Sequence, residues 1–418
     1  MKSCLLALIV VLGVAPLFAQ NNSPATITLD ALIQEALQNN PELRAFEATV
    51  EAAHARIPQM SSLDDPRFDL EIEEAPRAEP FNTSQWRMLN FGLTQMLPFP
   101  GKLAKAKKLA EIDAQHAHHD YAEKALDVIA EVKAAYFELY MIQRGLEVNR
   151  ENIDLMTQFV NIAKVRYAVG QVMNQDVLKA NVELARLANA QLTLQQQEET
   201  AKAMLNVLRN RPPQSPLGQT ILPARKPLLL DLETLQRTAV AHRPMFHHDS
   251  LGITQSRIAN SLARRAYWPD FDLSLKYVTS PLDGFRGFTA MAGVSLPFSL
   301  WSIKKQRGRV EETAAKTRMQ EAMLNNTKNM ILFAVKDGLT KVQNAQRMLE
   351  LYRATILPQA EQSLQVTLAN YQTRQTDFLM LLDSYRMLQM SKMEYYEAEA
   401  KYEMSLAELE RAVGKDLN

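Results

Sequence analysis

Four short segments of the chain alternate apolar and polar side chains with a period of two, the pattern of a half-buried β-strand. The expected strands lie at about 66–74, 88–97, 269–278 and 287–297. Their polar faces carry charged residues, among them Asp69, Glu71, Glu73, Asp272 and Lys276. A charged face opposite an apolar face is typical of a strand that separates a water-filled lumen from lipid.

The rest of the chain follows the helical period, with apolar residues three and four positions apart. The expected helices lie at about 28–58, 102–167, 174–209, 231–265, 303–371 and 377–413. The helix at 102–167 would be ~100 Å long at 1.5 Å per residue. Helices of that length are stable in water mainly within a coiled or bundled assembly. The pattern therefore predicts a mainly α-helical protein with a small β part.

The two halves of the chain repeat one another. Residues 143–150 return at 346–353 and residues 66–70 return at 269–273, in both cases 203 positions later. That period is far too long for a solenoid repeat and indicates a duplicated half-protein, each half ordered helix, strand, strand, helix. We expect a first repeat over 20–210 and a second over 231–418. A Pro-rich linker over 211–230 joins them.

The N-terminus has the pattern of a secretory signal peptide over residues 1–19. Lys2 precedes the apolar run 5–12, and a small-residue site ends near Ala19, so cleavage is expected before Gln20. No later stretch reaches the ~18 uninterrupted apolar residues of a membrane-spanning helix. The sequence thus predicts an exported protein that meets a membrane, if at all, without such a helix.

Composition excludes several classes of function. The only cysteine, Cys4, falls in the signal segment and away from the cleavage site, which argues against a disulfide framework, a thiolate metal site and a lipid anchor. Lys+Arg and Asp+Glu are equal at 47 each, so no basic field favours nucleic acid. Phosphate loops, nucleophile elbows and zinc-protease motifs are absent from the sequence, and we expect neither an enzyme nor a bound cofactor.

Four strands cannot close a barrel alone, because about eight are needed. Open edges in lipid would leave backbone groups unpaired, so we expect several subunits to share the strands, and three subunits would supply twelve. Trp86, Trp268 and Trp301 all lie just outside strand ends. Tryptophan at both ends of an apolar band indicates a membrane interface. A soluble sheet capped by aromatic residues is the alternative interpretation.

With these features the chain resembles the TolC-like outer-membrane factor family, over essentially its whole mature length. The resemblance rests on the duplicated plan, on Leu-Pro-Phe-Pro-Gly-Lys-Leu at 97–103 and on Tyr-Ala-Val-Gly-Gln at 167–171. The first motif is most like members of the heavy-metal efflux branch. The resemblance implies a homotrimer, with a 12-stranded β-barrel in the outer membrane of a Gram-negative bacterium and a long α-helical tunnel in the periplasm.

The resemblance also implies roles for residues at the inner end of the tunnel. An adaptor would dock on the two helix–helix turns, at Val169, Gly170, Gln171, Arg374 and Gln375. Arg374 stands where the family usually has glycine, which leaves the exact backbone of this turn open and suggests an adaptor contact by charge instead. The closed aperture would involve Asp176, Tyr371 and Asp383, with Met380 in place of a usual acid. For Asp176, an N-terminal helix cap is an alternative role.

Methionine and histidine clusters suggest metal binding but have plainer interpretations. Met380, Met387, Met390 and Met393 lie close together in sequence, and core packing is the favoured explanation. The histidines form two triplets, for which a surface location is favoured: His116, His118, His119, His242, His247 and His248. The sequence accordingly predicts no metal site.

The predicted function is that of a passive exit duct in a tripartite efflux pump. Expected partners are outer-membrane lipid, a periplasmic adaptor (membrane fusion) protein and an inner-membrane transporter of the resistance–nodulation–division type. Heavy-metal cations are the favoured substrates, and drugs are an alternative because a wide tunnel needs no tight recognition site. Two other functions stay open: a type I protein secretion duct and a soluble periplasmic coiled-coil scaffold.

Overall fold

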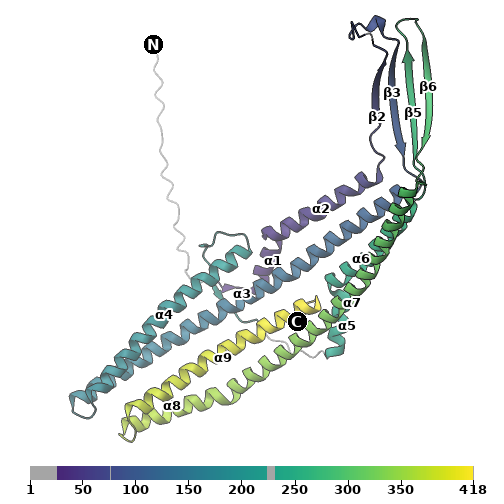
Figure 1. Cartoon of the computed structure of the whole chain (residues 1–418). Helices are drawn as coiled ribbons and strands as arrows, with labels where there is room; N and C mark the ends of the chain where they lie inside the picture. The colour runs from purple at the N-terminus through teal and green to yellow at the C-terminus, as the bar shows by residue number, and fades with distance from the viewer. Residues whose placement is uncertain (1–25, 76, 224–230, 418) are drawn as a thin grey trace, which may run out of the picture.

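The computed structural model describes residues 26–75, 77–223 and 231–417. Long helices form an extended body, and one four-stranded sheet stands at one end of it (Figure 1). The expected signal peptide over 1–19 and Cys4 lie outside the described residues, as do residues 224–230 of the expected linker. Among the described residues, no helix is both long enough and apolar enough to cross a membrane.

Each half of the chain has two short helices, a strand hairpin and then two long helical segments. The first half consists of α1 (Leu29–Asn39), α2 (Pro41–Ser61), β2 (Arg67–Glu73), β3 (Met88–Leu97), α3 (Lys102–Ala168) and α4 (Asn174–Leu208), with a 3-10 turn at Thr83–Gln85. The second consists of α5 (Leu232–His242), α6 (Pro244–Arg265), β5 (Phe271–Thr279), β6 (Arg286–Val294), α7 (Leu300–Leu351), a π-helical turn (Tyr352–Ile356), α8 (Leu357–Gln372) and α9 (Phe378–Val413). Two residues of β1 (Thr26–Ile27) pair in parallel with β4 (Gln219–Thr220).

The single helices expected at 28–58 and 231–265 are each two helices, so those predictions were wrong. Pro41 and Pro244 begin the second helix of each pair. A proline pushes the preceding residue out of the helical conformation, and Asn40 accordingly has ψ 124° and Arg243 has ψ 118°. The Asn40 side chain then caps α2 by accepting from the amides of Glu42 and Leu43.

The helix expected at 303–371 is also divided. The hydrogen-bond register changes in the π-helical turn at Tyr352–Ile356, directly before α8. Pro358 lies in the first turn of α8 and has no amide proton to donate, so the ladder cannot continue unchanged through it. The chain stays helical throughout and runs on to the turn that joins α8 to α9.

One antiparallel sheet contains the strands of both halves, in the order β2-β3-β5-β6. The two hairpins join through β3 and β5, where Leu97 lies opposite Phe271 and Leu89 lies opposite Thr279. β6 ends at Val294, ahead of the expected end at 297. Because β2 and β6 each pair on one side only within the chain, both leave an open edge.

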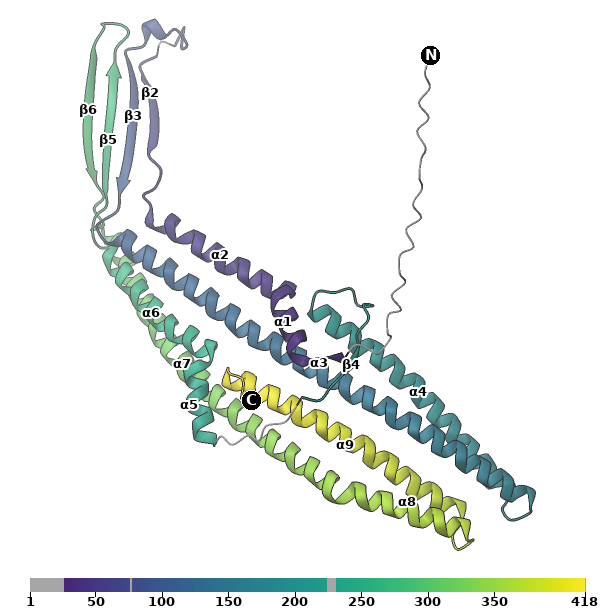
Figure 2. The same ribbon diagram turned by 180° about the vertical axis from the view of Figure 1, so that it is seen from behind.

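The long helices pack as two hairpins whose turns lie at the end opposite to the sheet (Figures 1 and 2). α3 packs against α4 and α2 of its own half, and also against α6 and α9 of the other half. Its Tyr136 is fully buried in the first core cluster and donates its hydroxyl proton to the carbonyl of Ile27 or Ile221. A separate cluster near the turns is built around Phe159, Leu381 and other apolar side chains. These contacts position the two turns next to each other.

Candidate functional site

The two tip turns, residues 169–173 between α3 and α4 and residues 373–377 between α8 and α9, share one backbone motif. Gly170 and Arg374 both have left-handed φ, at 71° and 65°. In the first turn the Gln171 amide donates to the carbonyl of Arg166 at 2.8 Å, and the Gln375 amide makes the equivalent bond to Asn370 at 2.8 Å. Both turns thus end their helix in a Schellman motif. The backbone that the sequence left open at Arg374 is thus the same as that at Gly170.

Arg166 ties the end of α3 to the end of α8, beside the two tip turns. Its Nη1 donates to the carbonyl of Tyr371 at 2.6 Å and its Nη2 to the carbonyl of Gln372 at 3.3 Å. The guanidinium carbon also lies 4.7 Å from the centroid of the Tyr371 ring, a cation–π contact. The sequence analysis did not single out Arg166. A basic residue in the last turn of a helix is a possible signal, because such residues often bond the unpaired carbonyls at helix C-termini.

Tyr371 is buried, with 2% of its surface exposed, and its ring packs against Phe378 at 5.9 Å between centroids. Its hydroxyl has no hydrogen-bond partner among the described residues. Burial raises the pKa of this phenol against the opposing effect of Arg166, and the nearby charge of Asp176 adds to the rise. The contact with Arg166 therefore uses the carbonyl and the ring face of Tyr371.

Asp176 lies in the first turn of α4, and the alternative role as its N-cap is wrong. The N-cap is Met173, whose side chain makes no capping bond. Asp176 is partly buried, and burial raises the pKa of its carboxyl. The positive charge of Lys179 opposes this rise, and the negative charge of Asp377 adds to it. In the second turn it is Asp377 that caps the helix, because it accepts from the Met380 amide at 2.9 Å.

Met380 and Asp383 lie on exposed parts of α9, one and two turns from the second tip turn. Met380 is 59% exposed. The structure therefore does not bring either residue into the contact between Arg166 and Tyr371.

A second tie between the helical hairpins lies farther from the tips. Arg386 on α9 donates to both carboxylate oxygens of Glu183 on α4, at 3.1 and 2.6 Å. Glu183 is buried, with 9% of its side chain exposed, whereas Arg386 is 41% exposed. Hydrogen bonding to Arg386 lowers the pKa of Glu183. Neither residue was singled out from the sequence.

The Leu-Pro-Phe-Pro-Gly-Lys motif forms the junction between the sheet and the helices. Asp270 accepts from the Phe99 amide at 2.7 Å and from the Lys102 ammonium at 2.8 Å. The Phe99 ring stacks on Trp268 with centroids 5.0 Å apart. Gly101 has φ 86°, and an added Cβ there would collide with Arg265. These residues make structural contacts, and none of the contacts described is that of a metal ligand.

The sheet separates its charged and apolar residues as the alternation predicts. Lys276 donates to Glu71 at 2.8 Å, and the neighbouring Asn90 donates to Glu73 at 3.2 Å. On the opposite face, Leu93 and Leu275 lie side by side. Asp69 and Asp272 belong to the polar face. The tryptophans lie at both ends of the strands: Trp86 precedes β3, Trp268 precedes β5 and Trp301 follows β6.

Of the four clustered methionines on α9, three do not pack into the core of the single chain, as core packing would require. Met380, Met387 and Met390 are 59%, 52% and 60% exposed in the single chain. Met393 does pack internally, with its methyl group close to Gly145.

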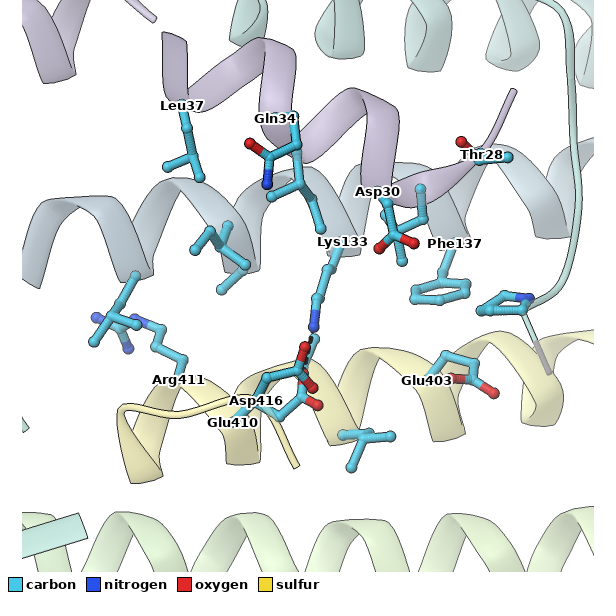
Figure 3. Close-up of a pocket in the computed structure, with 18 of the residues that line it drawn as sticks. Thr28, Asp30, Gln34, Leu37, Lys133, Phe137, Glu403, Glu410, Arg411 and Asp416 are labelled. Atoms are coloured by element: carbon cyan, nitrogen blue, oxygen red, sulfur yellow. Dashed lines mark hydrogen bonds and ion pairs between the residues drawn. The ribbon is translucent and has the colours of Figure 1, made fainter. Parts of the chain in front are cut away.

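A cavity of about 660 Å³ lies between α1, α3 and α9 (Figure 3). Lys133 extends from α3 across it to Glu410 on α9, with Nζ and Oε2 2.5 Å apart. Both side chains are buried, and desolvation raises the pKa of Glu410 against the opposing effect of Lys133. Asp30 and Asp416 line the same cavity. The ion pair holds the end of α9 against the middle of α3, and its role is therefore structural.

The element order, the four-stranded sheet and the paired hairpins are matched by known proteins. A sequence profile described as outer membrane efflux protein matches residues 32–210 and 236–415. The chain belongs to this family. Members are passive outer-membrane channels of tripartite efflux pumps, so this outer membrane efflux protein is a transport component and not an enzyme. It resides in the outer membrane and extends into the periplasm.

Individual relatives are similar to this chain over nearly its whole length. The cobalt-zinc-cadmium resistance protein CzcC of Cupriavidus metallidurans is 22% identical over 96% of this chain and 93% of its own. The solved structure of the outer-membrane channel OprN has a TM-score of 0.79 at 18% identity and covers 93% of this chain and 90% of its own. That of CusC has a TM-score of 0.79 at 17% identity and covers 93% and 92%. These structures share the fold.

Proposed function

We propose that three copies of this outer membrane efflux protein form a duct that is closed at rest and opens to release heavy-metal cations. Three four-stranded sheets would pair their open edges β2 and β6 to give twelve strands, which removes every unpaired backbone group from lipid. The polar face with Glu71 and Lys276 would line the lumen, and the face with Leu93 and Leu275 would meet lipid.

The contact between Arg166 and Tyr371 is the observation that supports a closed state at the tip turns. It joins the end of α3 to the end of α8 by a short charge-assisted hydrogen bond and a cation–π contact. Repeated by threefold symmetry, three such ties would hold the helix ends together. Asp176, with its raised pKa, and the exposed Asp383 would line the aperture and attract cations.

An adaptor protein would open the duct by docking on the tip turns. Val169 on the first turn is 62% exposed and apolar, whereas Arg374 and Gln375 give the second turn an exposed cationic and polar surface. The adaptor surface should therefore offer an apolar contact beside an acidic or amide group. The transporter behind it would be of the resistance–nodulation–division type.

Similarity to a cobalt-zinc-cadmium resistance protein over nearly the whole chain supports metal cations as the substrate. The Leu-Pro-Phe-Pro-Gly-Lys motif adds no ligand, because its residues are used at the junction. The substrate test is growth of the deletion strain, with and without the gene supplied, on zinc, cobalt, cadmium and silver salts and on hydrophobic drugs. Sensitivity confined to metals supports the proposal, and sensitivity confined to drugs would overturn the assignment of substrate.

The gate is tested by replacing Arg166 in protein reconstituted into planar bilayers. Arg166→Gln should raise the resting conductance at least several-fold. Tyr371→Phe should leave it unchanged, because the tie uses the carbonyl and the ring and not the hydroxyl. Arg150→Gln, at an exposed position on the same helix, is the matched control. Equal conductance in all four proteins would remove Arg166 from the gate.

A further inference from the structure

Two histidine pairs converge across the contact between α3 and α6, although more than a hundred residues separate them in sequence. The rings of His116 and His248 lie 4.2 Å apart at an interplanar angle of 64°, and those of His119 and His247 lie 5.8 Å apart at 26°. His116 and His119 come from the first half of the chain, His247 and His248 from the second. The expected surface location holds for His118 and His242, whereas these four histidines are partly buried.

His116 has both ring nitrogens buried and neither has a hydrogen-bond partner among the described residues. Buried polar atoms in native proteins are almost always satisfied, and an orphan commonly marks the place of a water or an ion. An imidazole nitrogen that makes no hydrogen bond is available to bind a metal ion through its lone pair.

His248 is already oriented as metal-binding histidines are. Its Nδ1 faces the carboxylate of Asp249 at 3.1 Å, and Asp249 in turn accepts from the Thr327 hydroxyl at 2.5 Å. The other nitrogen, Nε2, is directed toward Asp120 at 3.5 Å. A carboxylate that fixes one histidine nitrogen and leaves the other for a cation is the usual outer shell of a metal site.

Asp120 follows His116 by four residues on α3, so the two side chains lie on one face of the helix. Among the described residues no group of three or more His, Cys, Asp and Glu side chains is already arranged to hold a metal ion. A group of three would form if the His116 ring turned toward Asp120 and His248. Because its nitrogens make no hydrogen bonds, that rotation breaks none.

We propose that His116, Asp120 and His248 bind one divalent transition-metal ion between α3 and α6. Two imidazoles and a carboxylate suit Zn²⁺ and its neighbours Co²⁺ and Ni²⁺. Ca²⁺ and Mg²⁺ prefer oxygen ligands alone, and Cu⁺ prefers sulfur. The site lies ~75 Å along α3 from the first tip turn at 1.5 Å per residue, far from the proposed gate. Its ion would cross-link the two halves of the chain.

The test is metal titration of the purified full-length protein in detergent after chelator treatment, which requires neither transport nor the proposed gate. Calorimetry with Zn²⁺ and absorption spectra with Co²⁺ should report one ion per chain. His116→Gln and His248→Gln should each weaken binding at least tenfold. His118→Gln, at an exposed neighbouring position on α3, should bind as the unaltered protein does.

Zn²⁺ should also raise the thermal unfolding midpoint of the unaltered protein and of His118→Gln, but not that of His116→Gln. If the histidine variants fail to fold, Asp120→Asn is the second test, because the Asp120 side chain is 47% exposed and its loss is tolerable. No binding by the unaltered protein, or equal binding by all variants, would overturn the proposal. Loss of binding in His119→Gln with retention in His116→Gln would also overturn it.

Discussion

Gly170 and Arg374 occupy equivalent positions in the two tip turns, but only glycine adopts a left-handed backbone without strain. The motif is therefore the same while its stability differs between the two turns. An added Cβ at Gly170 would meet nothing within 4 Å, so a substitution there costs conformational energy and creates no clash. Arg374 has this unfavourable backbone, and we expect its exposed side chain to contribute to the proposed adaptor contact.

Arg374→Gly should stabilise the protein by about 1 kcal/mol, since glycine removes the penalty of the left-handed conformation. Gly170→Ala should destabilise it by a similar amount. Thermal unfolding of both variants in detergent measures the two shifts, with Gln375→Gly as a control in the same turn without a positive φ. A lower unfolding midpoint for Arg374→Gly would show that its side chain contributes more than its backbone costs.

At the scale of single elements, ion pairs between helices hold the hairpins in place. Glu183 and Arg386 tie α4 to α9, and Lys133 and Glu410 tie α3 to the end of α9. Glu151 and Lys392 form a more exposed pair between α3 and α9, with side chains 64% and 30% exposed. Buried pairs of this kind are strongly destabilised when one partner is removed, whereas exposed pairs contribute little.

Glu183→Gln should destabilise the protein at pH 7 by about 1–2 kcal/mol, a figure reduced because Arg386 is partly solvated. The pKa of Glu183 is lowered by Arg386 from its ordinary value of 4.5. A lowered acid pKa means that the stabilisation is present above 4.5 and is lost as the pH falls through the folded-state pKa.

Denaturant unfolding at several pH values measures this effect as the difference between the unaltered protein and Glu183→Gln. The difference should shrink below pH 4.5. Glu151→Gln, in the exposed pair, should change stability by less than about 0.5 kcal/mol at any pH. A difference for Glu183→Gln that is constant with pH would contradict the role of the charge.

Element types followed from the sequence more readily than element partners. Alternation predicted β2, β3, β5 and β6, and long periodic stretches predicted α3, α4 and α9, because each pattern is local. The helix breaks at Pro41 and Pro244 were equally local and were overlooked. Pairing of β3 with β5 was not predicted, since a hydrophobic period does not identify a partner strand.

In the candidate site, too, local features were predicted and long-range contacts were not. Gly170 and Tyr371 were found from motifs within a few residues, whereas Arg166 acts on a carbonyl 205 positions away. The histidines of α3 and α6 were treated as two surface groups because nothing in the sequence brings them together. Contacts between the two halves depend on how the long helices cross, and a local sequence pattern does not predict the crossing.

At the scale of the whole molecule, the two faces of the sheet should have opposite tolerance for charge. Leu275→Arg, on the apolar face, should impair assembly in the outer membrane, since arginine at the bilayer midplane costs about 2–4 kcal/mol. Ser274→Arg, one residue earlier on the polar face beside Thr94, should assemble normally and reduce cation selectivity. Heat-resistant oligomer in the outer-membrane fraction measures assembly, and equal assembly of both variants would contradict the assigned faces.

The central claim is that this chain works as a closed trimeric duct, and the most direct test combines mass and conductance. The detergent-purified protein is weighed by native mass spectrometry and then inserted into planar bilayers. The account predicts a trimer with a low, cation-selective resting conductance. A monomer or dimer, or a protein that inserts without conducting ions, would contradict it.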